Sequence, residues 1–282
     1  MNFSQRLGAA ALSHIVLVLP LAPPCLAQAV IPNFSGAVFD NSLNIDNPLF
    51  PLVPGTTYTY DVVNTDPGTG EVETEVIVLD VLHGVRTVAG IESRIVRDRV
   101  WLEGQIREDT FDWYAQDNAG NVWYMGEDVT DFHYDAMGNL IGTSHPGAWE
   151  TGVDGALPGY LMEASPLLGD HYYQEFLAGE AQDEAEIIGL GEMHTVPFGA
   201  FSDVVRTRDT SALDPTALEH KFYAPGVGKI LGHKLDVSTG AIVSVTTLRS
   251  VSVVPEPGAA TMLLFAAVGL LVGFARRQAS LR

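Results

Sequence analysis

The chain has 282 residues and one cysteine, and its 35 acidic side chains against 15 lysines and arginines give a net charge of −20. So acidic a chain repels nucleic acid, which excludes that class of partner. A single cysteine excludes a framework of disulfides within the chain.

The N-terminus predicts a secretory signal peptide over residues 1–29. A short leading region carries Arg6, and a mostly apolar stretch runs from Leu7 to Leu21. Ala27-Gln28-Ala29 then has the small-x-small pattern that signal peptidase cleaves, with Ala27 and Ala29 as the small residues. Val30 is therefore the expected first mature residue.

The single cysteine, Cys25, lies inside this leader. A cysteine there is the alternative signal, a lipoprotein site, but Pro23-Pro24 before it fits such a site poorly. Cleavage after Ala29 would leave a mature chain without thiol chemistry, whose stability must come from its core.

Residues 30–253 predict a secreted all-β domain. Glu71 to Leu82 begins with strict polar-apolar alternation, the pattern of a half-buried strand. Ile91 to Leu102 and Gln105 to Gln116 flank Glu103-Gly104, a tight hairpin turn. The other expected strands, in chain order, are 56–60, 172–177, 185–190, 201–208, 218–223, 229–235 and 241–251.

A five-residue unit, D-x-x-G-N, occurs at 117–121 and again at 135–139. Aspartate caps such turns and glycine takes the positive-φ position, so two turns this close predict strands of about five to seven residues. Residues 150–170 are rich in glycine and proline and predict a long loop or crossover. The expected fold is an antiparallel meander of about a dozen strands forming a curled sheet, a sandwich or a partial barrel.

The densest cluster of candidate functional side chains is the hairpin 111–128. It places Trp113-Tyr114 and Trp123-Tyr124 on adjacent strands, with each tryptophan and its neighbouring tyrosine on opposite faces. One pair can be core while the other is exposed to stack on a sugar; alternatively, both pairs are cross-strand packing. We expect the tryptophans to be core, which leaves Tyr114 and Tyr124 as possible ligand contacts.

Other chemistry is weakly signalled. Seven carboxylates between 109 and 135 lack the spacing of a calcium-binding EF-hand loop. The sequence has no H-E-x-x-H zinc pattern and no G-x-S-x-G nucleophile elbow. We therefore expect no metal, no cofactor and no enzymatic activity. The carboxylates in question are Asp109, Asp112, Asp117, Glu127, Asp128, Asp131 and Asp135.

The C-terminus, 254–282, has three parts. Val254-Pro255-Glu256-Pro257-Gly258 is an extended stretch, since proline cannot sit inside a helix. An uncharged apolar run from Ala259 to Ala275 follows, about as long as the shortest transmembrane helix. Arg276-Arg277 ends the run, which favours a cytoplasmic position for the arginines and places the domain outside.

A Pro-Glu-Pro, an apolar span and a terminal arginine pair, in this order at the C-terminus, resemble the PEP-CTERM sorting signal. The resemblance implies cleavage by an exosortase, a membrane transpeptidase, after transient anchoring through the C-terminal helix. It also implies export to the surface or matrix of a Gram-negative bacterium that makes exopolysaccharide. The alternative is an ordinary single-span anchor.

The middle of the chain also resembles an uncharacterised family of secreted bacterial proteins over residues 45–235. The similar segments are 47–58, 112–117, 120–128, 152–156 and 223–228. This resemblance implies no activity and no catalytic residues.

These observations leave two expected functions. The first is an exported, non-enzymatic surface protein with a structural or adhesive role, and exopolysaccharide as its partner. The second is an envelope binding module that holds a hydrophobic or carbohydrate ligand in a curled sheet. A hollow interior would favour the second function, and a filled one the first.

Overall fold

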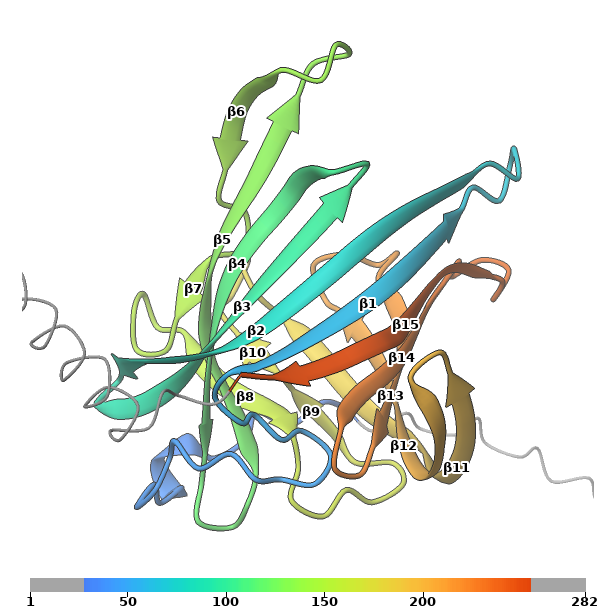
Figure 1. Ribbon diagram of the computed structural model, residues 1–282. Helices are drawn as coiled ribbons and strands as arrows, with labels where there is room; N and C mark the ends of the chain where they lie inside the picture. The colour runs from blue at the N-terminus through green and yellow to red at the C-terminus, as the bar shows by residue number, and fades with distance from the viewer. Residues whose placement is uncertain (1–27, 255–282) are drawn as a thin grey trace, which may run out of the picture.

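Within residues 28–254, which the computed structural model describes, the chain forms one antiparallel sheet of 15 strands (Figure 1). Neighbouring strands follow the order β10-β8-β5-β4-β3-β2-β1-β15-β14-β13-β12-β11-β9, and β6 and β7 also pair with β5. The elements are η1 (Phe34–Gly36), β1 (Thr56–Thr65), β2 (Val72–Val88), β3 (Ile91–Leu102), β4 (Gln105–Gln116), β5 (Val122–Tyr134), β6 (Leu140–Ser144), β7 (Trp149–Glu150), β8 (Leu157–Met162), β9 (His171–Tyr173), β10 (Glu175–Phe176), β11 (Asp183–Val196), β12 (Gly199–Ser211), β13 (Leu218–Ala224), β14 (Gly228–Leu235) and β15 (Ile242–Val253).

The sheet curls until its two ends meet at one short segment. β9 pairs with β11, whereas β10, which follows after Gln174, pairs with β8. Gln174 bridges both sides, because its N–H donates to the Asp183 carbonyl at 2.8 Å and its carbonyl accepts from the Gly159 N–H at 3.0 Å. The expected all-β antiparallel fold is therefore confirmed, as a single barrel-like sheet instead of a sandwich.

The segment before β1 covers one end of the curled sheet, and the β1–β2 and β5–β6 hairpins extend from the other (Figure 1). Ile45, Leu49 and Leu52 of this segment are buried in the main core. Asn47 fastens it, since its side-chain amide donates to the carbonyls of Gly120 at 2.9 Å and Glu163 at 3.1 Å. We call the covered end the capped end and the other the open end.

The strands β3 and β4 have the bounds that the sequence predicts. Glu103 and Gly104 between them have φ of 51° and 80°. Positive φ at both central residues is the conformation of the two-residue turn whose twist matches that of the flanking strands. Turn chemistry therefore sets the register of this hairpin.

Two expectations about the strands are wrong. Residues between the D-x-x-G-N turns form one long strand, β5 of 13 residues, instead of strands half that length. The expected loop over 150–170 contains β8. Gly159 explains why β8 was not predicted. A Cβ at this position would lie 1.9 Å from the Tyr173 carbonyl oxygen, so only glycine lets the two segments approach. Glycine, a loop signal in the sequence, here admits a neighbouring strand.

The tryptophan pair lies on the convex side of the sheet, under the N-terminal segment. Trp113 is 4% exposed and Trp123 is fully buried. The rings of Phe34 and Phe39 pack on Trp123 with centroids 5.3 and 6.1 Å away. The indole N–H of Trp123 donates to Asp117 at 2.9 Å. The expectation that these tryptophans are core is confirmed.

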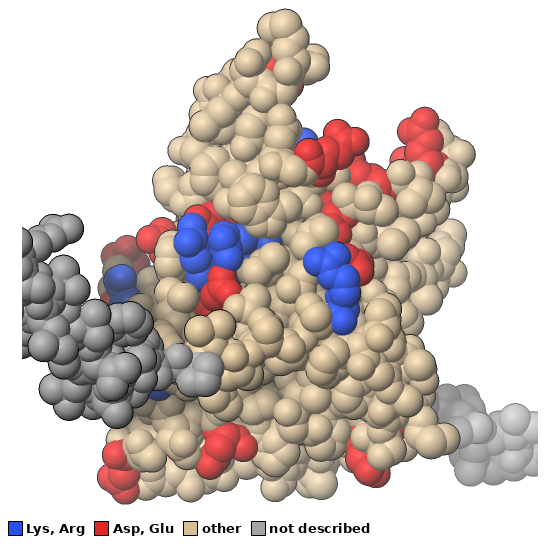
Figure 2. Space-filling model, viewed as in Figure 1, with Lys and Arg blue, Asp and Glu red and all other residues tan. Residues whose placement is uncertain are grey.

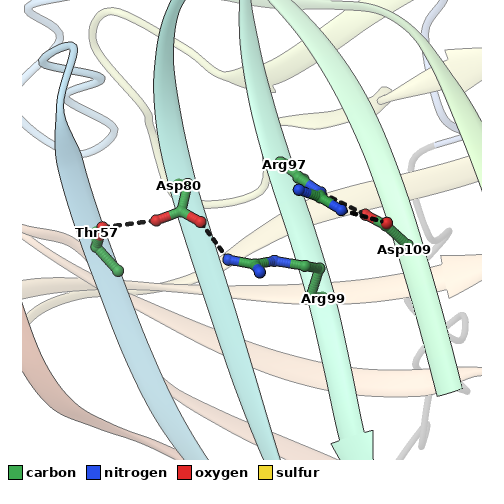
Figure 3. A network of polar contacts seen from close by, with 5 residues as sticks. All are labelled: Thr57, Asp80, Arg97, Arg99 and Asp109. Atoms are coloured by element: carbon green, nitrogen blue, oxygen red, sulfur yellow. Dashed lines mark hydrogen bonds and ion pairs between the residues drawn. The ribbon is translucent and has the colours of Figure 1, made fainter. Parts of the chain in front are cut away.

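Charges on the convex side are largely paired. Asp80 accepts a hydrogen bond from Thr57 at 2.6 Å and forms an ion pair with Arg99 (Figure 3). Arg97 donates two hydrogen bonds to the carboxylate of Asp109, at 2.7 and 2.6 Å. On the face shown in Figure 2, lysines and arginines lie in small groups beside acidic side chains. On the concave side, by contrast, several acidic side chains have no basic partner within the described part of the chain.

Candidate functional site

The concave side of β3, β4 and β5 carries carboxyl groups where strand alternation predicts apolar side chains. Asp98 lies between the inward positions Val96 and Val100, and Val96 pairs with Asp112 on β4. Asp112 in turn pairs directly with Glu127 on β5. Because directly paired residues of an antiparallel sheet share a face, these carboxyls line one wall of the interior.

A cavity of about 160 Å³ lies against this wall. Its lining residues come from the capped end, from β1 to β4, and from β8, β13 and β14. Its lining is mainly aromatic and aliphatic, with acids and lysines among them. The residues that matter for binding are Tyr58, Tyr60, Tyr114, Tyr223, Asp98 and Asp112, together with Lys221 and Lys229.

The interior acids are held in their protonated form. Burial raises the pKa of Asp98 to about 8, and the charge of Asp112 adds to the effect. Burial likewise raises the pKa of Asp112 to about 8, although a hydrogen bond from the Tyr124 hydroxyl at 2.6 Å opposes it. The pKa values of Glu127 and Glu175 also rise to about 8, through burial and then through acidic neighbours. At neutral pH these four groups are largely uncharged.

The interior lysines are partly committed to other partners. Burial alone would lower the pKa of Lys221, but Asp209 at 2.8 Å and Glu219 at 3.8 Å raise it well above its usual range. The ammonium of Lys229 lies 5.4 Å from the centre of the Tyr60 ring. The charge of Lys221 is thus balanced by Asp209 and Glu219. The carboxyl groups on β3, β4, β5 and β10 therefore outnumber the cations left to pair with them.

Several buried polar atoms of the interior have no hydrogen-bond partner among residues 28–254. They include Oε2 of Glu175, which is only 7% exposed, and Oδ1 of Asp98. The Trp149 indole N–H lies beside Glu175 but does not reach hydrogen-bond geometry. Buried groups of this kind are rare in folded proteins and mark sites where an outside partner can supply the missing bonds.

Tyr114 and Tyr124, the predicted ligand contacts, both face this interior. Their rings stack with centroids 5.0 Å apart and planes 17° apart. They lie on the face opposite the tryptophans, as alternation predicts, but that face is the inside of the curled sheet and not an exposed platform. Tyr114 is only 7% exposed. Their contact with a ligand stays a prediction.

The carboxylates considered for calcium are divided among different environments. Asp112 and Glu127 point inward, whereas Asp109 pairs with Arg97 on the convex side. Asp117 and Asp135 accept hydrogen bonds within their own turns, from Asn121 and Asn139. Nowhere in residues 28–254 do three or more histidine, cysteine or acidic side chains converge as metal ligands do.

Sequence reasoning missed Asp98, Glu175, Lys221 and Lys229. They come from strands far apart in the chain, so no local motif joins them. One signal was present: Asp98 lies two residues from Val96 and from Val100, so it interrupts a series of apolar positions on one face of the strand. A charged residue at an inward position of such a strand is the pattern that would have found it.

Most of the residues predicted for the sorting signal, and one of the two predicted for signal-peptide cleavage, lie outside the described part of the chain. These are Ala27, Pro255, Glu256, Pro257, Gly258, Arg276 and Arg277. Val254 is described, and its N–H donates to the Gly55 carbonyl at 2.8 Å, so the chain leaves the sheet beside the start of β1. Between residues 28 and 254, no helix has the length and apolar character needed to span a membrane.

The sequence matches no protein-family profile and no curated protein. Among solved structures, it is similar to a protein from Bacteroides fragilis described as exported and as having a YmcC-like fold. The identity is 14% and the TM-score 0.39, over 72% of this chain and 98% of that one. A Parabacteroides distasonis protein described as a lipoprotein is similar at 14% identity and a TM-score of 0.40, over 73% and 99% of the two chains.

Proposed function

We propose that this chain is an exported binding module that holds a small ligand inside its curled sheet. The observation that carries the proposal is the interior cavity whose wall includes the buried Oδ1 of Asp98, a carboxyl oxygen without a hydrogen-bond partner in the described chain. A sheet that served only as a scaffold would gain stability from apolar side chains at these positions, because an unpaired buried polar group costs about 1–3 kcal/mol. A ligand that supplies partners removes this cost.

A structural or adhesive role near an exopolysaccharide has less support. Its candidate platform was an exposed aromatic pair on the hairpin 111–128. There the tryptophans pack under the N-terminal segment and the tyrosines face the interior. Association with a matrix thus rests on the C-terminal tail alone, which concerns delivery and not binding.

Delivery is the second part of the proposal. Signal peptidase would cleave after Ala29, and an exosortase near Pro255-Glu256-Pro257 would release or transfer the domain at the outer side of the inner membrane. The support is the order of the leader, the domain and the tripartite tail in the sequence. Val254 leaves the sheet at the start of β1, near the capped end, so the open end would face away from the membrane.

Mass spectrometry of the surface fraction from the protein's own host tests delivery. We expect a mature N-terminus at Val30 and no peptide from 263–282. Intact tails on most of the mature protein would instead indicate a plain membrane anchor. A lipid-modified Cys25 as first residue would contradict cleavage after Ala29.

Native mass spectrometry of protein purified from the same host tests binding. We expect a retained small molecule that is released on denaturation. The variant Val96→Phe places a ring in the cavity and should lose the molecule. Val63→Phe is the matched control, because Val63 is an exposed residue of β1. Retention by Val96→Phe would contradict an interior site.

A further inference from the structure

We propose that the ligand is a small organic cation, an amine held by Asp98 and Asp112 against the tyrosine rings of the cavity, with Glu127 and Glu175 farther along the same sheet on β5 and β10. This inference rests on the proposed binding function and names its chemical class. Two independent observations carry it: the excess of interior carboxyls over cations, and the unpartnered oxygens of Asp98, on the cavity wall, and of Glu175, farther along the sheet.

The excess of carboxyls comes from five strands: β3, β4, β5, β10 and β11. Asp98 and Asp112 feel the field of Glu108, and Glu127 and Glu175 feel that of Asp183. Against these acids stands Lys229, while Lys221 is bound to Asp209 and Glu219. A cation placed beside these acids favours their ionised forms, so it gains attraction as they lose their protons, whereas an anion gains none.

The second observation is the set of unsatisfied acceptors. Glu175 is 7% exposed, and its Oε2 has no hydrogen-bond partner in the described chain; Oδ1 of Asp98, on the cavity wall, also has none. An ammonium group carries three N–H donors and no acceptor, so it matches oxygen atoms in need of donors. Hydrogen bonds between an ammonium and a carboxylate are among the stronger ones in proteins.

The arrangement favours an organic cation over a metal ion. In the described residues the carboxyls do not converge in a set of three or more suited to a metal. Two of them, Asp98 and Asp112, lie on a cavity wall whose lining includes the rings of Tyr60, Tyr114 and Tyr223. Aromatic faces attract organic cations, and their apolar surface suits the carbon chain of an amine.

Binding of such a ligand would release protons. The carboxyls hold protons when the site lacks a cation, because their ionised forms are buried beside one another. An ammonium beside them stabilises the ionised form, so each affected carboxylic acid becomes a carboxylate and its proton passes to the solvent. Affinity for the amine should then rise between pH 6 and pH 8, by up to tenfold per pH unit for each proton released.

Isothermal titration of the purified chain tests the inference. The probe is 1,4-diaminobutane, and its neutral counterpart of the same length is 1,4-butanediol. Titrations at pH 6, 7 and 8 in 150 mM NaCl, in two buffers of different ionisation enthalpy, give affinity and proton release together. We expect the diamine to bind at least tenfold more tightly than the diol, with at least threefold tighter binding per pH unit.

Two variants locate the effect. Asp98→Asn and Glu175→Gln remove a charge at nearly constant shape, and each should weaken diamine binding at least tenfold and reduce proton release. Asp128→Asn is the control, because Asp128 is exposed and adjoins Glu127 on the opposite face of β5. It should bind as the unaltered chain does.

Each other outcome overturns a different step. If the diol binds as tightly as the diamine, the site is a neutral polar one; the cation assignment falls and the binding function stands. If both inward variants bind the diamine unchanged, the amine sits on the acidic surface and the assignment falls. If neither probe binds and no molecule is retained in native mass spectrometry, the binding function itself falls.

Discussion

At the scale of single residues, Trp123 shows how a side chain that is suited to binding can be used for packing. Phe34, Phe39 and Tyr160 surround its indole, and Asp117 accepts its N–H. We expect Trp123→Ala to lower the free energy of unfolding by about 3–5 kcal/mol, the usual range for a large buried aromatic. Urea unfolding measures this loss. An unchanged midpoint would mean that the indole is not buried in solution.

Replacing Asp98 tests how much the ionisation of one buried carboxyl lowers the stability of the fold. At pH 5 the carboxyl is protonated and resembles an amide, so Asp98→Asn should have little effect. At pH 8.5 the unaltered chain must ionise this group in a buried place, and we expect the variant to be more stable by roughly 1–3 kcal/mol. Thermal unfolding at both pH values measures the difference. Asp128→Asn, on the exposed face, should show no such dependence on pH.

At the scale of elements, β8 depends on one glycine. A Cβ at position 159 would meet the Tyr173 carbonyl oxygen, so Gly159→Ala must push β8 and the β9–β10 segment apart. We expect a loss of about 2 kcal/mol or more in unfolding free energy, as in other overpacked sites. The control is Gly142→Ala in β6, where a Cβ has no neighbour within 4 Å. Equal stability of the two variants would contradict the role of Gly159.

The same elements show what the sequence can and cannot predict. β3 and β4 follow from alternation and from the Glu103-Gly104 turn, which are local signals. β8 does not, because Pro158-Gly159 has the composition of a loop and becomes a strand through a tertiary contact. The faces of Tyr114 and Tyr124 follow from alternation, but the curl that turns their face inward depends on pairing between distant strands. The interior acids are unpredictable for the same reason.

At the scale of the whole molecule, the interior acids set how stability depends on pH. Asp98, Asp112, Glu127 and Glu175 have pKa values of about 8 in the folded chain, far above the usual range of carboxyls. The folded state thus binds more protons than the unfolded state between about pH 4 and pH 8, and stability falls as pH rises through this window. We expect the melting temperature to be higher at pH 5.5 than at pH 8.5, by roughly 5 °C or more.

Other groups do not reverse this expectation. Burial lowers the pKa values of His220 and His233, so their contribution to stability increases as pH rises through their range. These two histidines oppose the trend set by the four acids but are outnumbered by them. Hydrogen bonds from Ser238 and Thr239 lower the pKa of Asp236 to about 2. This carboxylate therefore contributes stability that is lost only below about pH 4. Differential scanning calorimetry across pH 5 to 9 would measure the trend. A maximum near pH 8.5 would contradict the buried cluster.

The seam between the two ends of the sheet has a consequence for the order in which the strands can pair during folding. Val30 exchanges backbone hydrogen bonds with His171 and Tyr173, and β1 pairs with β15 at the far end of the domain. A chain that folds from its N-terminus must therefore hold Val30 unpaired until His171 and Tyr173 arrive, and one edge of β1 unpaired until β15 arrives. Throughout that wait the acids are in water and ionised. Closure then draws protons from the surroundings, so the final folding step is also a proton-uptake step.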